Sequence, residues 1–185
     1  GQELPMGQAY PAFQHYVKKQ TELGVVLAID SKNDEENALA GLNHQDSVLK
    51  PEDFACIKAN WQPKDVNLAE IASELSLGAD SFVFCDDNPA ERLIVEENTG
   101  ACAPEIGSVT DFIKVLDHSG FFEVLSLSED DRKRNEMYKE NAKRSELAVK
   151  FADYGEYLKA LEMKAEIKPF DAVSMARIAQ LTNKS

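Results

Sequence analysis

The chain has 185 residues, of which 43% are hydrophobic and 29% charged, a composition that allows a sizeable globular core. Its net charge of −13 disfavours binding to nucleic acid or to an anionic membrane surface, because both depend on a basic face. The sequence contains no apolar run long enough to indicate a membrane span, and its start lacks the pattern of a signal peptide. Its three cysteines, Cys56, Cys85 and Cys102, fit neither a disulfide framework nor a zinc-ligand pattern, so we expect reduced core thiols in a cytoplasmic protein.

Apolar runs alternate with amphipathic stretches through the first two thirds of the chain. The segments expected in order are a helix at 8–23, a strand at 25–29, a helix at 35–42, a short strand at 47–49, a turn and helical segment at 51–58, a helix from 63 to 77, a strand at 82–85, a helix at 89–98, a short strand at 101–105 and a helix after 108. This alternation predicts an α/β fold with a doubly wound, Rossmann-like parallel sheet.

The composition changes near residue 126. A long, charge-rich and largely solvated helix is expected from Ser128 to about Lys150, followed by a short helix, an alternating strand within 161–170 and a final helix capped by Asp171. The expected organisation is an α/β domain at 1–125, a helical connector at 126–160 and the first βα unit of a second domain at 161–185.

The stretch SFVFCDDNPAER places two acids directly after a buried strand and just before a helix. Asp86 and Asp87 would therefore lie at the carboxyl edge of the sheet, where open α/β proteins bind ligands. Adjacent carboxylates at such an edge suit Mg²⁺, which takes oxygen ligands. The alternative is that Asp87 and Asn88 only cap the following helix.

Two further polar clusters lie at expected strand ends or helix starts. Ser31 and Asn33 follow the first strand, and Lys64 opens a later helix. A hydroxyl that hydrogen-bonds a phosphoryl oxygen, a lysine that neutralises developing charge and an acid pair that holds Mg²⁺ are what phosphoryl transfer through an aspartyl phosphate requires. Each residue also has a simpler explanation, because Ser31 could cap a helix and Lys64 could be a surface lysine.

The order of these groups along the chain is hydroxyl, lysine and acid pair, which is the order in haloacid-dehalogenase-type (HAD) phosphatases and not that of response-regulator receivers. The segments VVLAIDSKND, NWQPKDVN, SFVFCDDNPAER and GFFEVLSLSEDDRKRNEMYKENAKR, with LEMKAEIKPF and AQLTNKS, resemble the FkbH-like family of HAD proteins over nearly the whole chain.

The resemblance implies a role for each matching residue. Ser31 is similar to the family's second-motif hydroxyl, and Lys64 to its phosphate-stabilising lysine. Asp86 is similar to the acid that binds Mg²⁺, with Asp87 as a second ligand or water anchor. Asn33 and Asn88 are expected to support the phosphate and the loop. A phosphorylated small molecule is the implied substrate.

The family's first motif, a strand that ends in Asp-x-Asp-x-Thr, has no counterpart in this sequence. We therefore expect that the nucleophile lies outside the chain, that the sheet is incomplete and filled by another segment or chain, and that this piece alone is inactive. After the HAD domain, family members carry a region resembling an acetyltransferase fold, and residues 164–168 with the helix after Asp171 look like its start.

The sequence differs from the FkbH-like family at a second point, which bears on whether an acyl carrier protein is its partner. Many FkbH-like proteins have a cysteine where this chain has Asp30, and members in polyketide pathways transfer a glyceryl unit to an acyl carrier protein. Asp30 cannot form the thioester that such transfer suits, and Cys85 is expected to be a core residue. Glyceryl transfer with a carrier-protein partner and a non-catalytic scaffold remain the alternatives to phosphatase or phosphotransferase chemistry.

Overall fold

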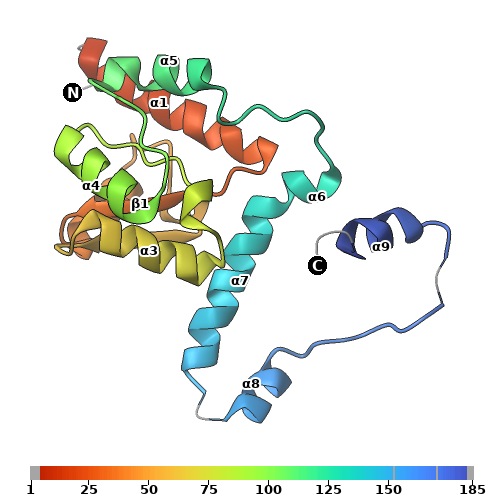
Figure 1. Cartoon of the computed structure of the whole chain (residues 1–185). Coiled ribbons are helices and arrows are strands. Elements are labelled where there is room, and N and C mark those ends of the chain that lie inside the picture. The colour runs from red at the N-terminus through yellow and green to blue at the C-terminus, as the bar shows by residue number, and fades with distance from the viewer. Residues whose placement is uncertain (1–4, 152, 170, 183–185) are drawn as a thin grey trace. The chain divides into compact units, whose positions relative to one another are not determined.

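A computed structural model describes residues 5–151, 153–169 and 171–182 (Figure 1). Its elements are α1 (Pro5–Gln20), a 3-10 turn (Thr21–Leu23), β1 (Ala28–Lys32), α2 (Glu35–Asn43), a 3-10 turn (Pro51–Asp53), β2 (Cys56–Asn60), α3 (Lys64–Leu75), a 3-10 turn (Ala79–Ser81), α4 (Pro89–Thr99), α5 (Val109–Ser119), α6 (Glu129–Arg132), α7 (Arg134–Val149), α8 (Tyr154–Ala160) and α9 (Met175–Thr182). The chain divides into two compact units, residues 1–146 and 147–185. None of the helices in the described ranges has the length and apolarity needed to cross a bilayer.

The sheet of the first unit is parallel. β1 pairs with β2 in a register that runs from Ala28 opposite Cys56 to Lys32 opposite Asn60. A separate parallel bridge joins Val83 to Cys102. Within the described residues, β1 has β2 as its partner on one side and no strand on the other. The expected α/β class with parallel pairing is confirmed, and the described sheet is not closed.

Helix α3 supplies the centre of the apolar core. Its apolar stripe is buried: Leu68, Ile71 and Leu75 are each at most 4% exposed. Leu68 packs in a cluster with Phe84 and Val95, whereas Ile71 and Leu75 pack in a second cluster on the side of the sheet. Because one helix faces both clusters, it holds the β1–β2 pair and the acid-bearing segment in one unit, with α4 against it (Figure 1).

Helices α1 and α5 pack side by side (Figure 1). Phe13 and Phe112 meet edge to face, with ring centroids 5.0 Å apart and planes at 85°, a geometry that the aromatic quadrupole favours. Leu116 of α5 is 2% exposed. Tyr10 of α1, in contrast, is 56% exposed.

The strand expected at 47–49 does not form. The backbone N–H groups of Val48 and Leu49 donate to Oε1 of Gln14 on α1, at 2.8 and 3.0 Å. A side chain from a distant helix therefore takes the donors that a strand ladder would use.

The first strand lies later than the expected 25–29, and β2 forms where no strand is expected. The segment 25–27 is an extended lead-in, and the strand itself is Ala28–Lys32. β2 falls inside the expected turn and helical segment at 51–58, which is helical only as the turn Pro51–Asp53. Its sequence, CIKAN, has too few apolar residues to signal a strand alone, and pairing with β1 decides its conformation.

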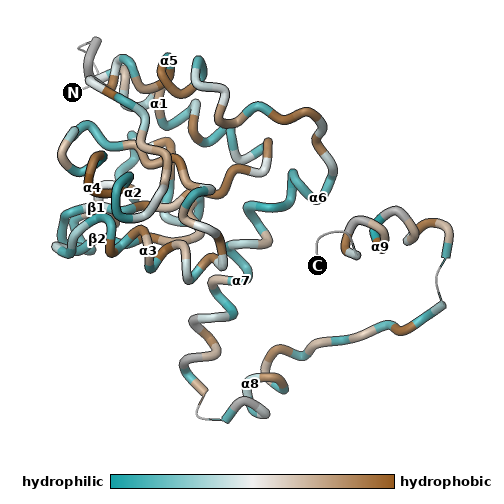
Figure 2. Tube along the Cα trace, viewed as in Figure 1, coloured by the Kyte–Doolittle hydropathy of each residue, from teal (hydrophilic) through white to brown (hydrophobic). Residues whose placement is uncertain are grey.

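The charge-rich helix is interrupted at Lys133, which separates α6 from α7. Arg132, Lys133 and Arg134 are exposed, as expected for a solvated face, and the start of this region is hydrophilic (Figure 2). Ser128 begins α6 with a capping box, accepting from the Asp131 backbone N–H at 3.1 Å.

The strand expected at 164–168 is absent: residues 163–169 have no regular secondary structure. Met163 and Ile167 are 71% and 95% exposed, so the alternating pattern has no surface to pack on. The helix expected after Asp171 starts later, as α9, while the short helix α8 is confirmed. Phe170 and residues 183–185 of the expected second domain lie outside the described residues.

Candidate functional site

Lys64 and Asp86 form an ion pair at the carboxyl edge of the parallel segments. Their side chains are 15% and 7% exposed. The Lys64 ammonium also lies 5.7 Å from the centroid of the Phe84 ring, within the range of a cation–π contact. Residues that are 22 positions apart and were predicted separately are therefore brought into one partly dry site.

The loop that carries Asp86 is shaped by its own residues. The second carboxylate oxygen, Oδ1, accepts from the Asn88 backbone N–H at 2.8 Å. Asn88 Oδ1 in turn accepts from the Ala90 N–H at 3.0 Å, which caps α4, and Pro89 occupies the first helical position. Asn88 therefore caps α4 and helps to set the turn in which Asp86 lies.

Arg92 is a supporting residue that the sequence did not reveal. This arginine on α4 is 9% exposed, and its Nη1 donates to the carbonyl oxygens of Asp86 at 2.7 Å and Ile106 at 3.0 Å. It joins the two parallel segments behind the acid. The i, i+4 spacing from Asn88 was visible in the sequence, but no pattern there indicated that an arginine would turn inward.

Asp30 is the central residue of β1 and belongs to a buried polar network. Its Oδ1 accepts from Asn67 Nδ2 at 3.0 Å. Asn67 is fully buried on α3, one turn after Lys64, and exchanges two hydrogen bonds with Asn60 of β2, at 3.0 and 3.1 Å. In the sequence, Asp30 is notable only because it cannot form a thioester, and no pattern there indicates a role for Asn67.

The carboxyl group of Asp30 is electrostatically strained. Desolvation raises its pKa to about 6, against a usual value of 3.8, although the Asn67 hydrogen bond and the charge of Lys64 oppose that rise. The charges of Asp86 and Glu91 raise the pKa further. The charges of Lys64 and Asp86 therefore act on Asp30 in opposite directions.

Ser31 is the fourth of the five residues of β1, and Asn33 follows the strand directly. Ser31 is partly buried in β1, opposite Ala59, and its backbone carbonyl accepts from the Asn33 N–H at 3.0 Å. Asn33 Oδ1 accepts from the Asp34 N–H at 2.9 Å, so this amide shapes the turn. Between them, Lys32 forms an ion pair with Glu91 of α4, which ties the turn to the loop of the acid pair.

The two predicted metal ligands differ in their surroundings. Asp86 is buried and already contacts Lys64 and the Asn88 N–H, whereas Asp87 is exposed. In the part of the chain that the structure describes, no three His, Cys, Asp or Glu side chains are grouped to hold a metal ion. The donors present are hard carboxylate oxygens, which fit Mg²⁺ as one side of a coordination shell and not as a complete cage.

Cys85 is a poor candidate for thiol chemistry. Burial raises the pKa of its thiol to about 12, and the neighbouring Cys102 and Asp86 act in the same direction. A thiol in this state is protonated at neutral pH and therefore a weak nucleophile.

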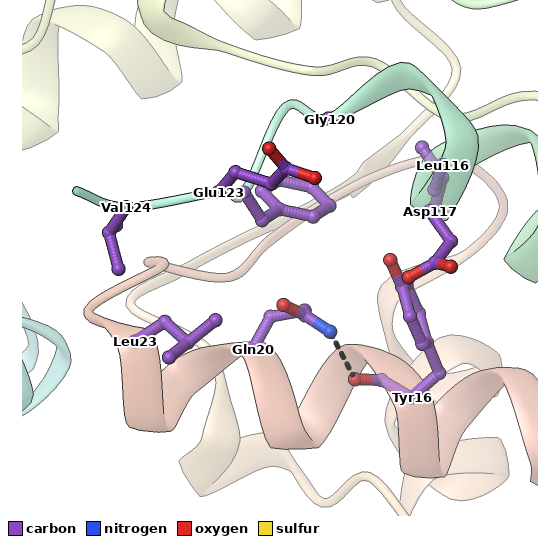
Figure 3. A pocket seen from close by; sticks show the side chains of 9 residues that line it. Tyr16, Gln20, Leu23, Leu116, Asp117, Gly120, Glu123 and Val124 are labelled. Atoms are coloured by element: carbon purple, nitrogen blue, oxygen red, sulfur yellow. Dashed lines mark hydrogen bonds between the residues drawn. The ribbon is translucent and has the colours of Figure 1, made fainter.

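A hollow of about 440 Å³ lies elsewhere in the first unit, between α1, α5 and the segment that follows α5 (Figure 3). Asp117 and Glu123 line it together with Tyr16 and Gln20, and none of its lining residues is a predicted site residue. Burial and then the charge of Asp117 raise the pKa of Tyr16. Two carboxylates and no cationic side chain line this hollow, which disfavours a phosphate there.

The chain is similar to a solved structure, the N-terminal part of a Bacteroides fragilis protein that contains a phosphatase domain and is complexed with Mg. The two are 38% identical, with a TM-score of 0.65, over 69% of this chain. The match covers 35% of the other chain, so this chain corresponds to about a third of it. No protein-family model matches the sequence, and no curated protein matches it significantly.

Proposed function

We propose that this chain is the central part of a Mg²⁺-dependent phosphatase or phosphotransferase of the HAD type, in its FkbH-like branch. The reaction would proceed through an aspartyl phosphate whose nucleophile lies on a segment outside the chain. The observation that carries the proposal is the partly dry Lys64–Asp86 ion pair at the carboxyl edge of a parallel α/β unit. The similarity to a phosphatase domain complexed with Mg supports it.

Each residue of the site has a role that its surroundings allow. The Lys64 ammonium neutralises negative charge that develops on the transferred phosphoryl group. Ser31, at the end of β1, donates its hydroxyl to a phosphoryl oxygen. Asn33 and Asn88 hold the two turns from which these groups act, through the hydrogen bonds to the Asp34 and Ala90 N–H groups.

Asp86 and Asp87 are the residues that would hold Mg²⁺. The ion supplies positive charge that binds the phosphate and offsets its repulsion from the carboxylates. Asp86 is already fixed by the Asn88 N–H and Arg92, which prepares one carboxylate for this role. The substrate class that suits the site is a small phosphate monoester.

The open sheet supports a nucleophile from outside the chain. β1 has a strand on one edge within the described residues, and the pair formed by Val83 and Cys102 is separate from it. Unpaired strand edges readily accept a further strand. A strand placed between β1 and Val83 would end beside Asp30 and Asp86, close to the charged side chains of the candidate site.

The test is hydrolysis of p-nitrophenyl phosphate by the protein expressed from the complete reading frame, with and without Mg²⁺. We expect Mg²⁺-dependent activity that Asp86→Ala and Lys64→Ala each lower by about 100-fold or more. Asp65→Ala is the matched control, because it removes a carboxylate from the residue next to Lys64 and should leave the rate nearly unchanged. Full activity of the Asp86→Ala protein would refute the assignment.

Two alternatives have weaker support. Glyceryl transfer to an acyl carrier protein needs a reactive thiol, whereas Asp30 stands at the expected position and the pKa of Cys85 is raised. Mass-spectrometric detection of a loaded carrier protein would favour it nonetheless. A non-catalytic scaffold would retain the ion pair but show no Mg²⁺-dependent turnover in the assay above.

A further inference from the structure

The hollow between α1, α5 and the segment after α5 has a volume of about 440 Å³, which lies in the range of small-molecule pockets. None of its lining residues belongs to the Lys64–Asp86 site. One part of its lining is apolar and the other part carries hydrogen-bonding groups (Figure 3). The apolar residues are Leu23, Leu116, Phe122 and Val124, and those with hydrogen-bonding groups are Tyr16, Gln20, Asp117 and Glu123.

Three of these polar groups lack a protein partner. Among the residues that the structure describes, none forms a hydrogen bond or an ion pair with the Tyr16 hydroxyl or with the carboxylates of Asp117 and Glu123. Tyr16 and Asp117 point toward one another from α1 and α5 (Figure 3), and the charge of Asp117 adds to burial in raising the pKa of Tyr16. The three groups therefore face the hollow and can bind a ligand there.

Both helices end at the hollow. Gln20 is the last residue of α1, and Gly120 caps the C-terminus of α5. A helix C-terminus carries partial negative charge and stabilises a cation placed next to it. A Cβ atom added to Gly120 would lie 3.7 Å from the Glu123 carboxyl carbon, so this side chain folds back over the end of α5. Two carboxylates and two helix C-termini are thus directed at one space.

The protein does not neutralise this charge from within the hollow. The last turns of α1 and α5 contain three basic residues that do not line it, namely Lys18, Lys19 and His118. A bare metal ion is a poor fit, because no three His, Cys, Asp or Glu side chains are grouped to hold one in the described ranges. The aromatic and apolar part of the lining suits a cation that is attached to a carbon chain.

We propose that this hollow is a binding site for a small organic cation, namely an ammonium group on a short apolar chain. The ammonium group donates hydrogen bonds to the carboxylates of Asp117 and Glu123, and the chain packs against the apolar part of the lining near Leu116. The site is separate from the Lys64–Asp86 pair, so the proposal does not depend on the phosphatase activity proposed above.

Three probes test the charge and the chain separately: pentylammonium, its neutral analogue 1-pentanol, and the ammonium ion. Each is titrated into the protein expressed from the complete reading frame, at pH 7.5 and constant ionic strength, with saturation-transfer NMR as the measure of binding. Pentylammonium should bind at least about 10-fold more tightly than either of the others. The alcohol lacks the charge, and the ammonium ion lacks the apolar chain.

Variants then locate the bound cation. Asp117→Asn and Glu123→Gln should each weaken pentylammonium binding by about 3- to 10-fold, a range that allows for the exposure of both carboxylates to solvent. The double variant should lose the preference for pentylammonium over pentanol. Glu97→Gln is the matched control, because it removes an exposed carboxylate from α4, outside the hollow, and should keep the affinity of the wild type.

Equal affinities of the wild type for pentylammonium and pentanol would overturn the inference, as would an unchanged affinity in the double variant. A loss in Glu97→Gln as large as that in Glu123→Gln would also overturn it, since attraction by the net charge of −13 would then explain the binding. Because these measurements involve no turnover, their failure leaves the phosphatase proposal standing.

Discussion

Two isoleucines show how differently the two units of the chain are built. Ile71, in the first unit, is 1% exposed between α3 and the sheet, whereas Ile167, in the second, is 95% exposed. The same contrast extends to Val95, fully buried, and Val173, 93% exposed. Apolar side chains are thus present in both units, but a core forms only where helices and strands from distant parts of the sequence face one another.

The polar contacts follow the same division. In the first unit, Asp30, Asn60 and Asn67 come from three different elements and meet in one network. In the second unit, Asp153 caps α8 through Glu156 N–H, and Asp171 accepts from Ser174 N–H, both only three residues away. Contacts between distant residues assemble the candidate site, whereas local contacts of this kind only end or begin helices.

The largest expected effect is a difference in the free energy of unfolding between matching isoleucine variants of the two units. Ile71→Ala removes a fully enclosed side chain and should lower the free energy of unfolding by about 3 to 4 kcal/mol. Ile167→Ala removes a side chain that is 95% exposed and should change the free energy of unfolding by less than about 0.5 kcal/mol. Urea unfolding followed by circular dichroism measures both. Equal losses would show that Ile167 is buried in solution.

A smaller effect is expected from the ion pair. Lys64→Met and Asp86→Asn each leave a partly buried partner without its counter-charge and should cost about 2 to 3 kcal/mol. Asparagine keeps an acceptor for the Asn88 N–H, so the loop is preserved. The double variant should lose about 1 to 2 kcal/mol less than the sum of the single variants. Strict additivity in urea unfolding would contradict a direct interaction.

The smallest effect concerns Asp30 and depends on pH. Its pKa is raised from 3.8 to about 6 on folding, so between these values the folded state binds more protons than the unfolded state and stability falls as pH rises. Above pH 6 the full cost of the ionised group is present. Because the residue is only partly buried, we expect Asp30→Asn to gain about 1 kcal/mol at pH 8 relative to wild type, with the gain vanishing near pH 4.

Asp65→Asn provides the control for that measurement, since it changes the net charge by the same amount at a neighbouring position of the first unit. Thermal unfolding at pH 4, 6 and 8 gives the comparison. A gain for Asp30→Asn that is independent of pH would mean that ionisation of Asp30 is not its cause.

The helices of the first unit were the most predictable part of the fold. Gly24, Gly100 and Gly120 end helices in the left-handed region, and Asn88 and Ser108 begin them, all signals that act within a few residues. β2 and the absent strand at 47–49 were not predictable, because their outcomes depend on β1 and on Gln14. The expected strand at 164–168 failed for the same reason, since alternation needs a neighbouring strand to become a sheet.

The sequence by itself determined the residue types of the candidate site and their order: Ser31, Lys64, and then Asp86 and Asp87. It did so because strand ends and helix caps are local features. Only the tertiary structure decided that Lys64 pairs with Asp86, that Asp87 stays exposed, and that Asn67 and Arg92 hold the site from behind. It alone left one oxygen of Asp30 without a donor among the residues that the structure describes, because burial and hydrogen-bond partners depend on which elements pack together.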